Sequence, residues 1–332
     1  DKPGAKDTNG FTRQNWFEPV GRECRMLRDA AGIIDISNFA KYRVSGQQAE
    51  AWLNAVFANT MPKAVGRSCL TPLIGIRGGI AGDFTVTRLA EDEFMIIGSG
   101  MAERYHQRFW KMVPMPESVR FESQTEALCG FNVAGPKSRE LLQRLTNTSL
   151  ATGDFPFMRS KRIELAGVDC LALRVSFTGD LGWELHCKTE DQLRLYEALL
   201  DCAKEFGAGP VGARALMSLR VEKGYGSWSR EYSPEYWPQE VGLDGLIKLD
   251  KEFLNKQAYL AIKDQTPRER LSIIEIISPD NADATGGEPI FDKSGAGVGR
   301  VTSGTYGYGV NKSLALCYLK NVTAGDSLDV MI

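Results

Sequence analysis

The stretch GAGPVGARALMSLRVEKGYG, residues 207–226, decides which fold this sequence can adopt. Gly207, Gly209 and Gly212 have the G-x-G-x-x-G spacing that cradles a pyrophosphate in dinucleotide-binding proteins, where a strand must precede the glycines. The preceding residues, DQLRLYEALLDCAKEF, instead repeat apolar side chains at helical three- and four-residue spacing, namely Leu193, Tyr196, Leu200, Ala203 and Phe206. Pro210 also removes one amide that would have to face phosphate. The sequence therefore predicts that the glycines turn one helix into the next, and it disfavours an NAD or FAD site here.

Both halves of residues 1–265, about 1–125 and 126–265, alternate strands with amphipathic helices, without an open parallel βαβ series. The predicted strands are KYRVSG (41–46), the pair FTVTRLAEDEFMIIGS (84–99) turning at Glu91 and Asp92, LCGFNVAG (128–135), and the hairpin RIELAGVDCLALRVSFTG (162–179). Besides the helices on either side of the glycine turn, the predicted helices are QQAEAWLNAVFAN (47–59), MAERYHQRFWKMV (101–113) and PKSRELLQRLT (136–146). From residue 266 onward we expect only short strands, with a hairpin turn at GAGVG (295–299).

This order of predicted strands and helices predicts an α+β fold. We expect one domain over residues 1–265, built from two mixed subdomains of about 1–125 and 126–265, and a small C-terminal β domain over residues 266–332. The sequence lacks an initiator Met and stops at SLDVMI, which looks like an unfinished strand. We therefore expect the β domain to be truncated and the chain to be a piece of a longer polypeptide.

Composition excludes several classes of function. The chain has 332 residues, 43% hydrophobic and 25% charged, and its 40 basic and 42 acidic residues leave a net charge of −2. No basic footprint for nucleic acid or an anionic membrane is present. Its 7 cysteines are scattered and never spaced C-x-x-C, which favours a reducing compartment and argues against zinc. With neither a long apolar run nor a signal peptide, we expect no membrane partner and a cytoplasmic location, or the mitochondrial matrix in a eukaryote.

Two carboxylates are the strongest candidates for chemistry. Asp83 follows a glycine-rich turn and opens a strand with apolar or Thr neighbours, where an idle charge is expensive; the alternative is a turn residue bonded to its own backbone. Glu184 follows the tight turn at Asp180, and strand alternation places it opposite Trp183. The two histidines, His106 and His186, are expected to be structural, and no Ser-His-Asp grouping is recognisable.

Collinear motifs resemble the aminomethyltransferase (T-protein) family of the glycine cleavage system. They are GGIAGDFTVT (78–87), SFTGDLGWEL (176–185), VGARALMSLRVEKGYG (211–226), GLIKLDKEFLNKQAYL (245–260) and GRVTSGTYGYGVNKSLALCYL (299–319). Two longer stretches, residues 15–46 and 222–251, are more similar still to the folate-binding C-terminal half of dimethylglycine and sarcosine dehydrogenases. The resemblance implies the family's fold, with two mixed α+β subdomains around a central folate site and a small β-barrel or jelly-roll-like domain.

The resemblance also implies roles for individual residues. Glu184 matches the glutamate that accepts the pterin N3–H and 2-amino donors of tetrahydrofolate, a charge-assisted arrangement. Asp83 matches the essential aspartate near N5, where a carboxylate can act as a base and stabilise positive charge. Arg214, Phe177 and Tyr225 are the other residues expected to bind the folate.

Three positions depart from the family pattern. Ala215 stands where the family usually has Asp, which leaves open which residue pairs with Arg214. Phe177 replaces a common tyrosine, so a flat apolar surface is kept and a hydroxyl is lost. Leu246 stands where many members carry an aromatic residue, so one stacking wall of the pterin site is expected to differ.

The resemblance implies three functions. The first is a tetrahydrofolate-dependent transferase that captures the one-carbon unit from a methylated amine as 5,10-methylenetetrahydrofolate, beside an FAD-dependent dehydrogenase or oxidase domain or subunit. FAD itself is expected only in that separate part, because neither glycine cluster has the context of a pyrophosphate site. The second is a free-standing methyltransferase that demethylates a sulfonium or other donor onto tetrahydrofolate. The third is a folate-binding regulator without turnover, against which the presence of both Asp83 and Glu184 argues.

Overall fold

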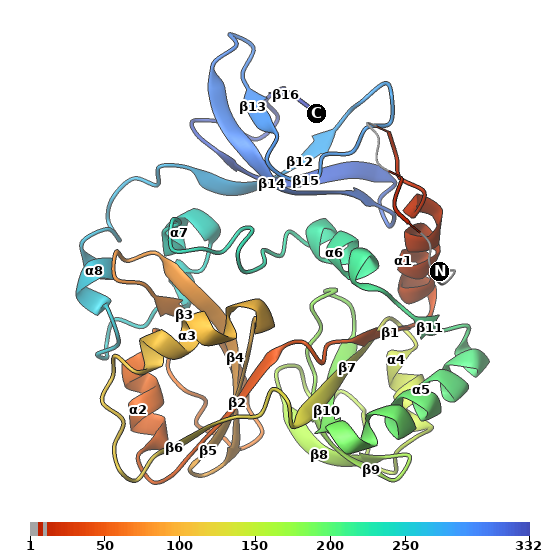
Figure 1. Cartoon of the computed structure of the whole chain (residues 1–332), viewed down its shortest axis with the longest axis vertical. Coiled ribbons are helices and arrows are strands. Elements are labelled where there is room, and N and C mark those ends of the chain that lie inside the picture. Colours follow the sequence, from red (N-terminus) through yellow and green to blue (C-terminus); the bar gives the residue numbers. More distant parts are fainter. Residues whose placement is uncertain (1–5, 9–11) are drawn as a thin grey trace.

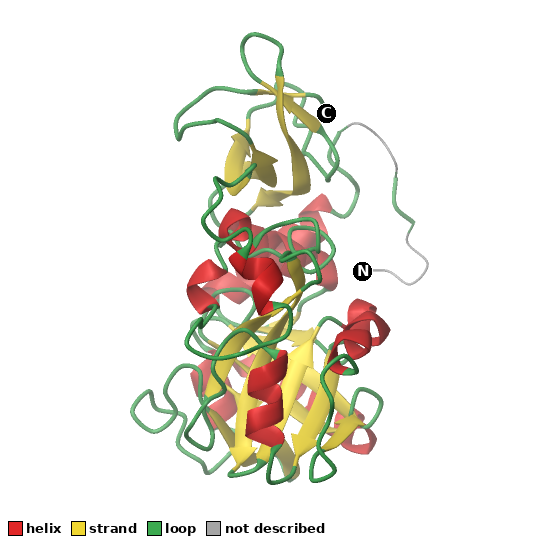
Figure 2. Ribbon diagram, turned by 90° about the vertical axis from the view of Figure 1, so that its left-hand side faces the viewer, coloured by secondary structure: helices red, strands yellow, loops and turns green. Residues whose placement is uncertain are grey.

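Residues 6–8 and 12–332 are described by the structure, a computed structural model, and within them three sheets surround a middle layer of helices (Figures 1 and 2). Two sheets lie side by side, and the third lies on the far side of that helical layer. The middle helices are α1 (Phe17–Asp29), α6 (Ala213–Glu222) and α7 (Pro238–Val241), with α8 (Lys256–Leu260) and the short turn η3 (Asp244–Leu246) at one edge. The helical layer therefore lies between the C-terminal sheet and the other two sheets.

The first sheet has five strands in the order β3-β4-β5-β2-β6. They are β2 (Ala40–Ser45), β3 (Ser68–Ile74), β4 (Ile80–Ala90), β5 (Glu93–Gly98) and β6 (Arg120–Ser123). Helices α2 (Ala49–Val56) and α3 (Glu103–Trp110), the latter preceded by η1 (Gly100–Ala102), bury their apolar side chains against one face of it. The β4–β5 hairpin turns at Glu91 and Asp92, which confirms the predicted strand pair.

The second sheet has the order β11-β1-β7-β10-β9-β8. Its strands are β1 (Gly32–Asp35), β7 (Leu128–Ala134), β8 (Ser160–Leu165), β9 (Val168–Leu173), β10 (Gly182–Lys188) and β11 (Gly209–Pro210). Helices α4 (Ser138–Gln143) and α5 (Gln192–Phe206), the latter preceded by η2 (Thr189–Asp191), cover its outer face. Because β1 pairs with β7 and β11, the chain enters this sheet before it builds the first one.

The third sheet, in the C-terminal part of the chain, has the order β12-β15-β14-β13-β16. Its strands are β12 (Arg270–Ile276), β13 (Pro289–Phe291), β14 (Gly297–Gly307), β15 (Lys312–Leu319) and β16 (Asp329–Val330). Helix α6 packs between β14 and α1, and the Ser218 hydroxyl donates to the backbone oxygen of Tyr306. No helix occurs beyond residue 266, as predicted, and the α+β class is confirmed.

The first two sheets face each other across a small apolar cluster of Met95, Ile97, Leu171 and Leu173. We call the space between these facing sheets the seam. A backbone bridge between Arg67 and Arg159 joins the sheets at one end. Residues opposite one another in an antiparallel pair share a face, so strand register determines which side chains enter the seam.

The glycine stretch has the predicted arrangement. Helix α5 precedes it, Gly207 ends that helix in a left-handed conformation (φ 66°), and α6 follows Gly212. The predicted stripe on α5 was partly wrong, since Leu193 is 65% exposed while Leu195, Leu199 and Cys202 are buried. The apolar residues form two overlapping helical stripes, and contact with the sheet selects the one centred on Leu199.

The predicted hairpin RIELAGVDCLALRVSFTG is also longer than the observed one. Strands β8 and β9 form it, but pairing ends at Leu173 and residues 174–181 form a loop. None of the helices described in residues 6–8 and 12–332 is long and apolar enough to cross a membrane. The predicted boundaries near residues 125 and 265 remain a proposal.

Candidate functional site

Asp83 lies on the seam face of β4. It shares strand parity with Thr85 and Thr87, which pair with Ile97 and Met95 of the seam cluster, whereas Phe84 and Val86 pack into the helix-covered core. The Asp83 side chain is half-buried, and the structure gives it no side-chain hydrogen bond from another described residue. Burial raises the pKa of Asp83 to about 6. A carboxyl with such a pKa is mostly ionised at neutral pH and well placed to take up a proton.

Glu184 enters the same seam from the opposite sheet. It pairs in register with Leu173 of the seam cluster and with Asn132, while its neighbours Trp183 and Leu185 belong to the opposite core, as predicted. Only 7% of Glu184 is exposed. Within the described residues its sole close polar partner is His186, whose Nε2 lies 3.5 Å from a carboxylate oxygen. Glu184 is therefore a nearly buried carboxylate that retains most of its capacity to accept hydrogen bonds.

Lys41 is a seam residue that the sequence analysis missed. It pairs with Ile97 and is fully buried, and its ammonium donates to the backbone oxygens of Ser37 and Phe39 at 2.8 and 2.9 Å. Burial lowers the pKa of Lys41, and nearby anionic groups that include Glu184 oppose that shift. In KYRVSG, Tyr42 and Val44 face the core, and the residues between them alternate to the other face. The same pattern is found in a strand whose other face is exposed to solvent. Only knowledge of the second sheet places Lys41 inside.

Two aromatic rings face each other close to the seam. Phe177, in the loop between β9 and β10, and Tyr225, just after α6, have ring centroids 6.2 Å apart and planes inclined by 24°. A flat ring between two others needs roughly twice the 3.5 Å contact distance between carbon atoms, so a small outward movement would admit one. The loop carrying Phe177 is tied down by Arg28, which contacts Asp180 at 2.7 Å and Glu222 at 3.0 Å.

The segment after Tyr225 leads back to Asp83. Burial raises the pKa of the Tyr232 hydroxyl, and the Asp83 carboxylate adds to that shift. Further along, the backbone oxygen of Tyr236 accepts from Ile80 at the start of β4. This connecting segment, residues 225–236, therefore runs from the aromatic pair to the Asp83 strand.

Arg214 lies apart from these groups. It is on the first turn of α6, where its guanidinium pairs with Asp7 at 2.6 Å and covers the ring of Trp16 at 4.6 Å. None of its ion pairs within the described residues reaches Asp83 or Glu184. Within the described residues, Asp7 is therefore the ion-pair partner of Arg214 that the sequence left open. A folate-binding role for Arg214 stays a prediction.

The other residues named from sequence have structural surroundings. His106 is fully buried among Phe84, Tyr105 and Trp228, and burial lowers its pKa to about 4, so its ring is neutral. These surroundings support the expected structural role. Leu246 is half-buried in η3. No cluster of three or more metal-ligating side chains occurs in the described part of the chain.

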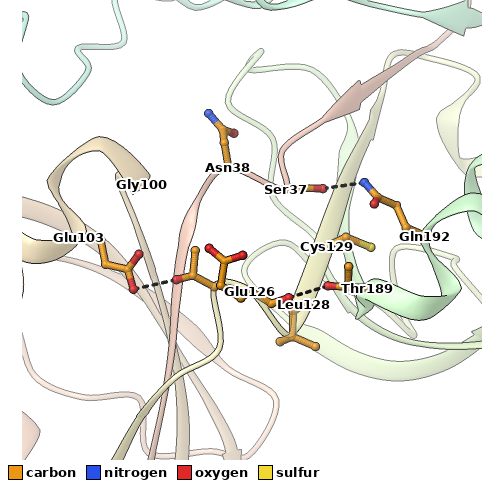
Figure 3. A pocket seen from close by; sticks show the side chains of 10 residues that line it. Ser37, Asn38, Gly100, Glu103, Glu126, Leu128, Cys129, Thr189 and Gln192 are labelled. Atoms are coloured by element: carbon orange, nitrogen blue, oxygen red, sulfur yellow. Dashed lines mark hydrogen bonds between the residues drawn. The ribbon is translucent and has the colours of Figure 1, made fainter.

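A cavity of about 360 Å³ opens beside the β1–β2 crossover, near Lys41 (Figure 3). Its walls include Ser37, Glu103, Thr125 and Gln192, linked by hydrogen bonds from Gln192 to Ser37 and from Thr125 to Glu103. None of the site residues predicted from sequence lines this cavity. It does not define the candidate site, which is the seam itself.

Comparison with known families matches both parts of the chain. Residues 3–251 match the GCVT N-terminal domain, and residues 270–332 match the glycine cleavage T-protein C-terminal barrel domain. The chain belongs to the folate-dependent aminomethyltransferase family. The resemblance stated from the sequence motifs is thereby confirmed.

Individual relatives of this aminomethyltransferase-family chain fall into two groups. The chain is 36% identical to mitochondrial dimethylglycine dehydrogenase of Mus musculus over 96% of its own residues, but it spans only 37% of that protein's length. It is 27% identical to an aminomethyltransferase of Thermoanaerobacter sp., covering 98% of this chain and 89% of that one. A crystal structure of aminomethyltransferase T from Bartonella henselae superposes with a TM-score of 0.86 over 99% of this chain and 90% of that one, at 21% identity. The aminomethyltransferase fold is therefore shown.

The seam has the donor and acceptor character that the family's ligand, tetrahydrofolate, requires. The pterin offers paired N–H donors, and Glu184 is a buried acceptor whose only close polar partner among the described residues is His186. A nearly buried carboxylate that lacks donors is costly, and a ligand bearing donors would remove that cost. The residues present thus fit the ligand.

Proposed function

We propose that this chain catalyses tetrahydrofolate-dependent one-carbon transfer. It would capture the iminium or formaldehyde unit from oxidative demethylation of dimethylglycine or sarcosine as 5,10-methylenetetrahydrofolate. The observation that carries the proposal is the pair Glu184 and Asp83, two carboxylates that face one seam from opposite sheets and receive no hydrogen bond of ordinary length from the described residues. The likeness to dimethylglycine dehydrogenase supports the choice of substrate.

In this proposal Glu184 holds and orients the pterin. Its carboxylate accepts the two parallel donors of the ring, and His186 at 3.5 Å restricts the movement of the carboxylate. Phe177 and Tyr225 supply apolar faces close to the seam. Tetrahydrofolate supplies the nitrogen nucleophiles that accept the carbon.

In this proposal Asp83 is the base that accepts a proton released from the folate nitrogens. Capture of an iminium carbon forms two C–N bonds to the folate and breaks the bond to the amine, while two N–H protons are lost. One proton leaves with the amine and the other needs a base. Asp83, with a pKa of about 6, is ionised and able to accept it at neutral pH. Its negative charge also stabilises the cationic carbon before capture.

The oxidation belongs, in this proposal, to an FAD-dependent domain or subunit outside the chain described. Removing a hydride from an amine needs an acceptor that no side chain provides. The mouse dehydrogenase is much longer than the part this chain matches, which leaves room for such a domain in that relative. A neighbouring folate site would capture the iminium before water hydrolyses it to free formaldehyde.

A free-standing transferase is the second candidate, because this chain covers 89% of the Thermoanaerobacter aminomethyltransferase. In that case the one-carbon donor would be a sulfonium or another methylated compound. Mass spectrometry of the folate product separates the two functions. A methylated folate formed without any flavoprotein favours the second candidate, whereas 5,10-methylenetetrahydrofolate formed only beside an oxidising flavoprotein favours the first.

Binding tests the proposal most directly. Calorimetry of this chain with tetrahydrofolate under reducing conditions should give a saturable heat with one folate per chain. Circular dichroism on the same sample shows that the protein is folded. Folded protein that gives no binding heat would contradict the proposal whichever donor is considered.

A further inference from the structure

A second cavity, of about 480 Å³, lies where the C-terminal sheet meets the β3–β4 loop and the segment leading into α7. Four cationic side chains line it, each from a different segment: Arg77 from the β3–β4 loop, Arg268 from the link before β12, Arg300 from β14, and Lys320 just after β15. Glu235 and Glu269 are the two carboxylates in its lining, so the walls carry a net positive charge. None of these residues belongs to the seam.

Arg268 is held rigidly at one wall. Its Nε and Nη2 donate to the two carboxylate oxygens of Glu240 at 2.9 and 2.7 Å, and its guanidinium stacks on Trp237 at 4.2 Å. Glu240 is almost fully buried behind it. Nη2 also donates to the backbone oxygen of Glu235, so Nη1, which donates to no described residue, is the group left for an anion, and it loses little conformational freedom on binding because the guanidinium is already fixed.

Arg300 is fixed in a similar way. It donates to the Tyr236 hydroxyl and approaches both carboxylate oxygens of Glu269 at 3.4 Å. These long contacts leave its charge only partly compensated. Tyr236 in turn stacks on Tyr318 with ring centroids 3.7 Å apart, which anchors this wall to the C-terminal sheet.

Arg77 and Lys320, in contrast, have no interaction partner among the described residues. Both are exposed, and within the described residues no hydrogen bond, ion pair or ring contact involves either side chain. They follow strands of different sheets, β3 and β15, and both line this cavity. Two unpaired cations beside two pre-fixed guanidinium groups can engage more than one anionic group at a time.

We propose that this cavity binds a small polyanion with at least two carboxylate or phosphate groups. The ligand would place its charges between Arg77 and Lys320 and use Arg268 and Arg300 as fixed donors. Binding would tie the C-terminal sheet to the β3–β4 loop, and so to the strand that carries Asp83. The proposal does not depend on folate binding, because the two sites share no residue.

Calorimetry at low ionic strength tests the proposal, with inorganic pyrophosphate and citrate as probes of the two anion chemistries. At least one probe should bind saturably with one ion per chain and should raise the melting temperature as its concentration rises. Binding should weaken with added salt. Tighter binding of pyrophosphate assigns the site to phosphate ligands, and tighter binding of citrate assigns it to polycarboxylates.

The double variant Arg77→Gln/Lys320→Gln should lose affinity for that probe by about tenfold or more, since two charge-assisted contacts are removed. Its fold should be unaffected, as neither side chain has a partner. Arg270→Gln is the matched control, because Arg270 is an exposed cation of the same sheet that does not line the cavity. No binding of either probe, or an equal loss in the control and the double variant, overturns the proposal.

Discussion

At the scale of single residues, Glu184 is the side chain that most requires a ligand with hydrogen-bond donors. Replacing it with Gln turns one accepting oxygen into a donor that faces the pterin donors. We expect the Glu184→Gln variant to bind tetrahydrofolate more weakly by about 1–3 kcal/mol. Calorimetry measures the difference. The fold should survive, because the substitution keeps the size of the side chain.

Glu164→Gln is the control for this variant. Glu164 lies on β8 of the same sheet, with its side chain exposed. Its substitution should leave folate affinity unchanged. If Glu184→Gln bound folate as tightly as the parent protein, Glu184 would be removed from the pterin site.

Asp83 separates chemistry from binding. If its carboxylate takes up the proton or stabilises the cationic carbon, Asp83→Asn should lower turnover by about 10²-fold or more. Folate affinity should change far less. The measurement is single-turnover transfer at saturating folate, with Asp92→Asn in the exposed turn of the same hairpin as the control. Equal turnover in variant and parent would leave Asp83 without a catalytic role; the alternative role of a turn residue is already ruled out, because Asp83 lies within strand β4 and pairs with Pro72.

The raised pKa of Asp83 has a second result, which concerns stability. The pKa rises from 3.8 to about 6 on folding, so the folded protein holds this proton more tightly than the unfolded chain does. Ionisation of Asp83 therefore lowers the stability of the folded protein. This loss of stability is absent below pH 3.8, grows as the pH rises towards 6, and is complete above 6. Asp83→Asn should therefore raise the free energy of unfolding at pH 7 by about 1–3 kcal/mol.

Urea unfolding at pH 4 and pH 7 checks this expectation. The gain in the variant should shrink towards zero at the lower pH. A variant that is less stable than its parent at pH 7 would show that the Asp83 carboxylate has a partner that stabilises its charge. The same substitution thus should stabilise the protein while it removes activity.

Strand parity made some site residues predictable. The alternation around Glu184 correctly placed Trp183 on the opposite face, because it depends only on local backbone geometry. Lys41 was not predictable, since a strand with one apolar face reads the same whether its other face meets water or another sheet. The position of Arg214 depends on Asp7, which lies far away in sequence.

At the scale of elements, a buried ion pair fixes the segment that follows α6. Arg220 and Glu231 are both fully buried, with 2.8 Å between Nη1 and Oε2, and the Ser303 hydroxyl of β14 bonds to both side chains. Removing one partner leaves an uncompensated charge. We expect Arg220→Met or Glu231→Gln each to lower the free energy of unfolding by about 3–5 kcal/mol.

The double variant Arg220→Met/Glu231→Gln completes a cycle. It should cost clearly less than the sum of the two single substitutions, because no buried charge is left alone. Chemical denaturation provides all the values required. Additive losses would mean that the two side chains stabilise the protein independently, which contradicts a coupled pair.

The elements themselves were largely readable from sequence. The helices on either side of the glycine turn and the β4–β5 hairpin occur where predicted, whereas helix α1 (Phe17–Asp29) was not predicted. Residues 174–179 were predicted to continue the hairpin because RVSFT has high strand propensity. The loop is held instead by Arg28 and Asp180, a contact between distant parts of the chain that propensity does not contain.

At the scale of the whole molecule, the proposal divides the reaction between parts. We expect the protein of 332 residues to be colourless and unable to oxidise dimethylglycine or sarcosine by itself, while still binding folate. Absorbance at flavin wavelengths and reduction of an artificial electron acceptor test the first statement. A yellow preparation that oxidises dimethylglycine would contradict the division.

Capture can be measured when an FAD-dependent dehydrogenase is joined to this chain. Less free formaldehyde should then accumulate when tetrahydrofolate is supplied. The joined protein with Glu184→Gln is the matched control, since its oxidation step is untouched.

Sequence motifs in collinear order sufficed to predict the family. They did not predict that the chain enters the second sheet with β1 before it forms the first sheet, because pairing between distant strands leaves no local signal in the sequence.

The position of β1 also affects how the protein is made. Residues 32–35 leave the ribosome before the residues with which they pair in the sheet, which are 131–134 and 209–210. The first sheet can pair as soon as β6 has been synthesised, whereas the second cannot be completed until β11, residues 209–210, has been synthesised. During translation the apolar strand β1, Gly-Ile-Ile-Asp, is therefore unpaired until its partner strands β7 and β11 have been synthesised. This nascent chain is exposed to aggregation over that interval, and its yield in cells should depend on chaperones that cover the waiting strand.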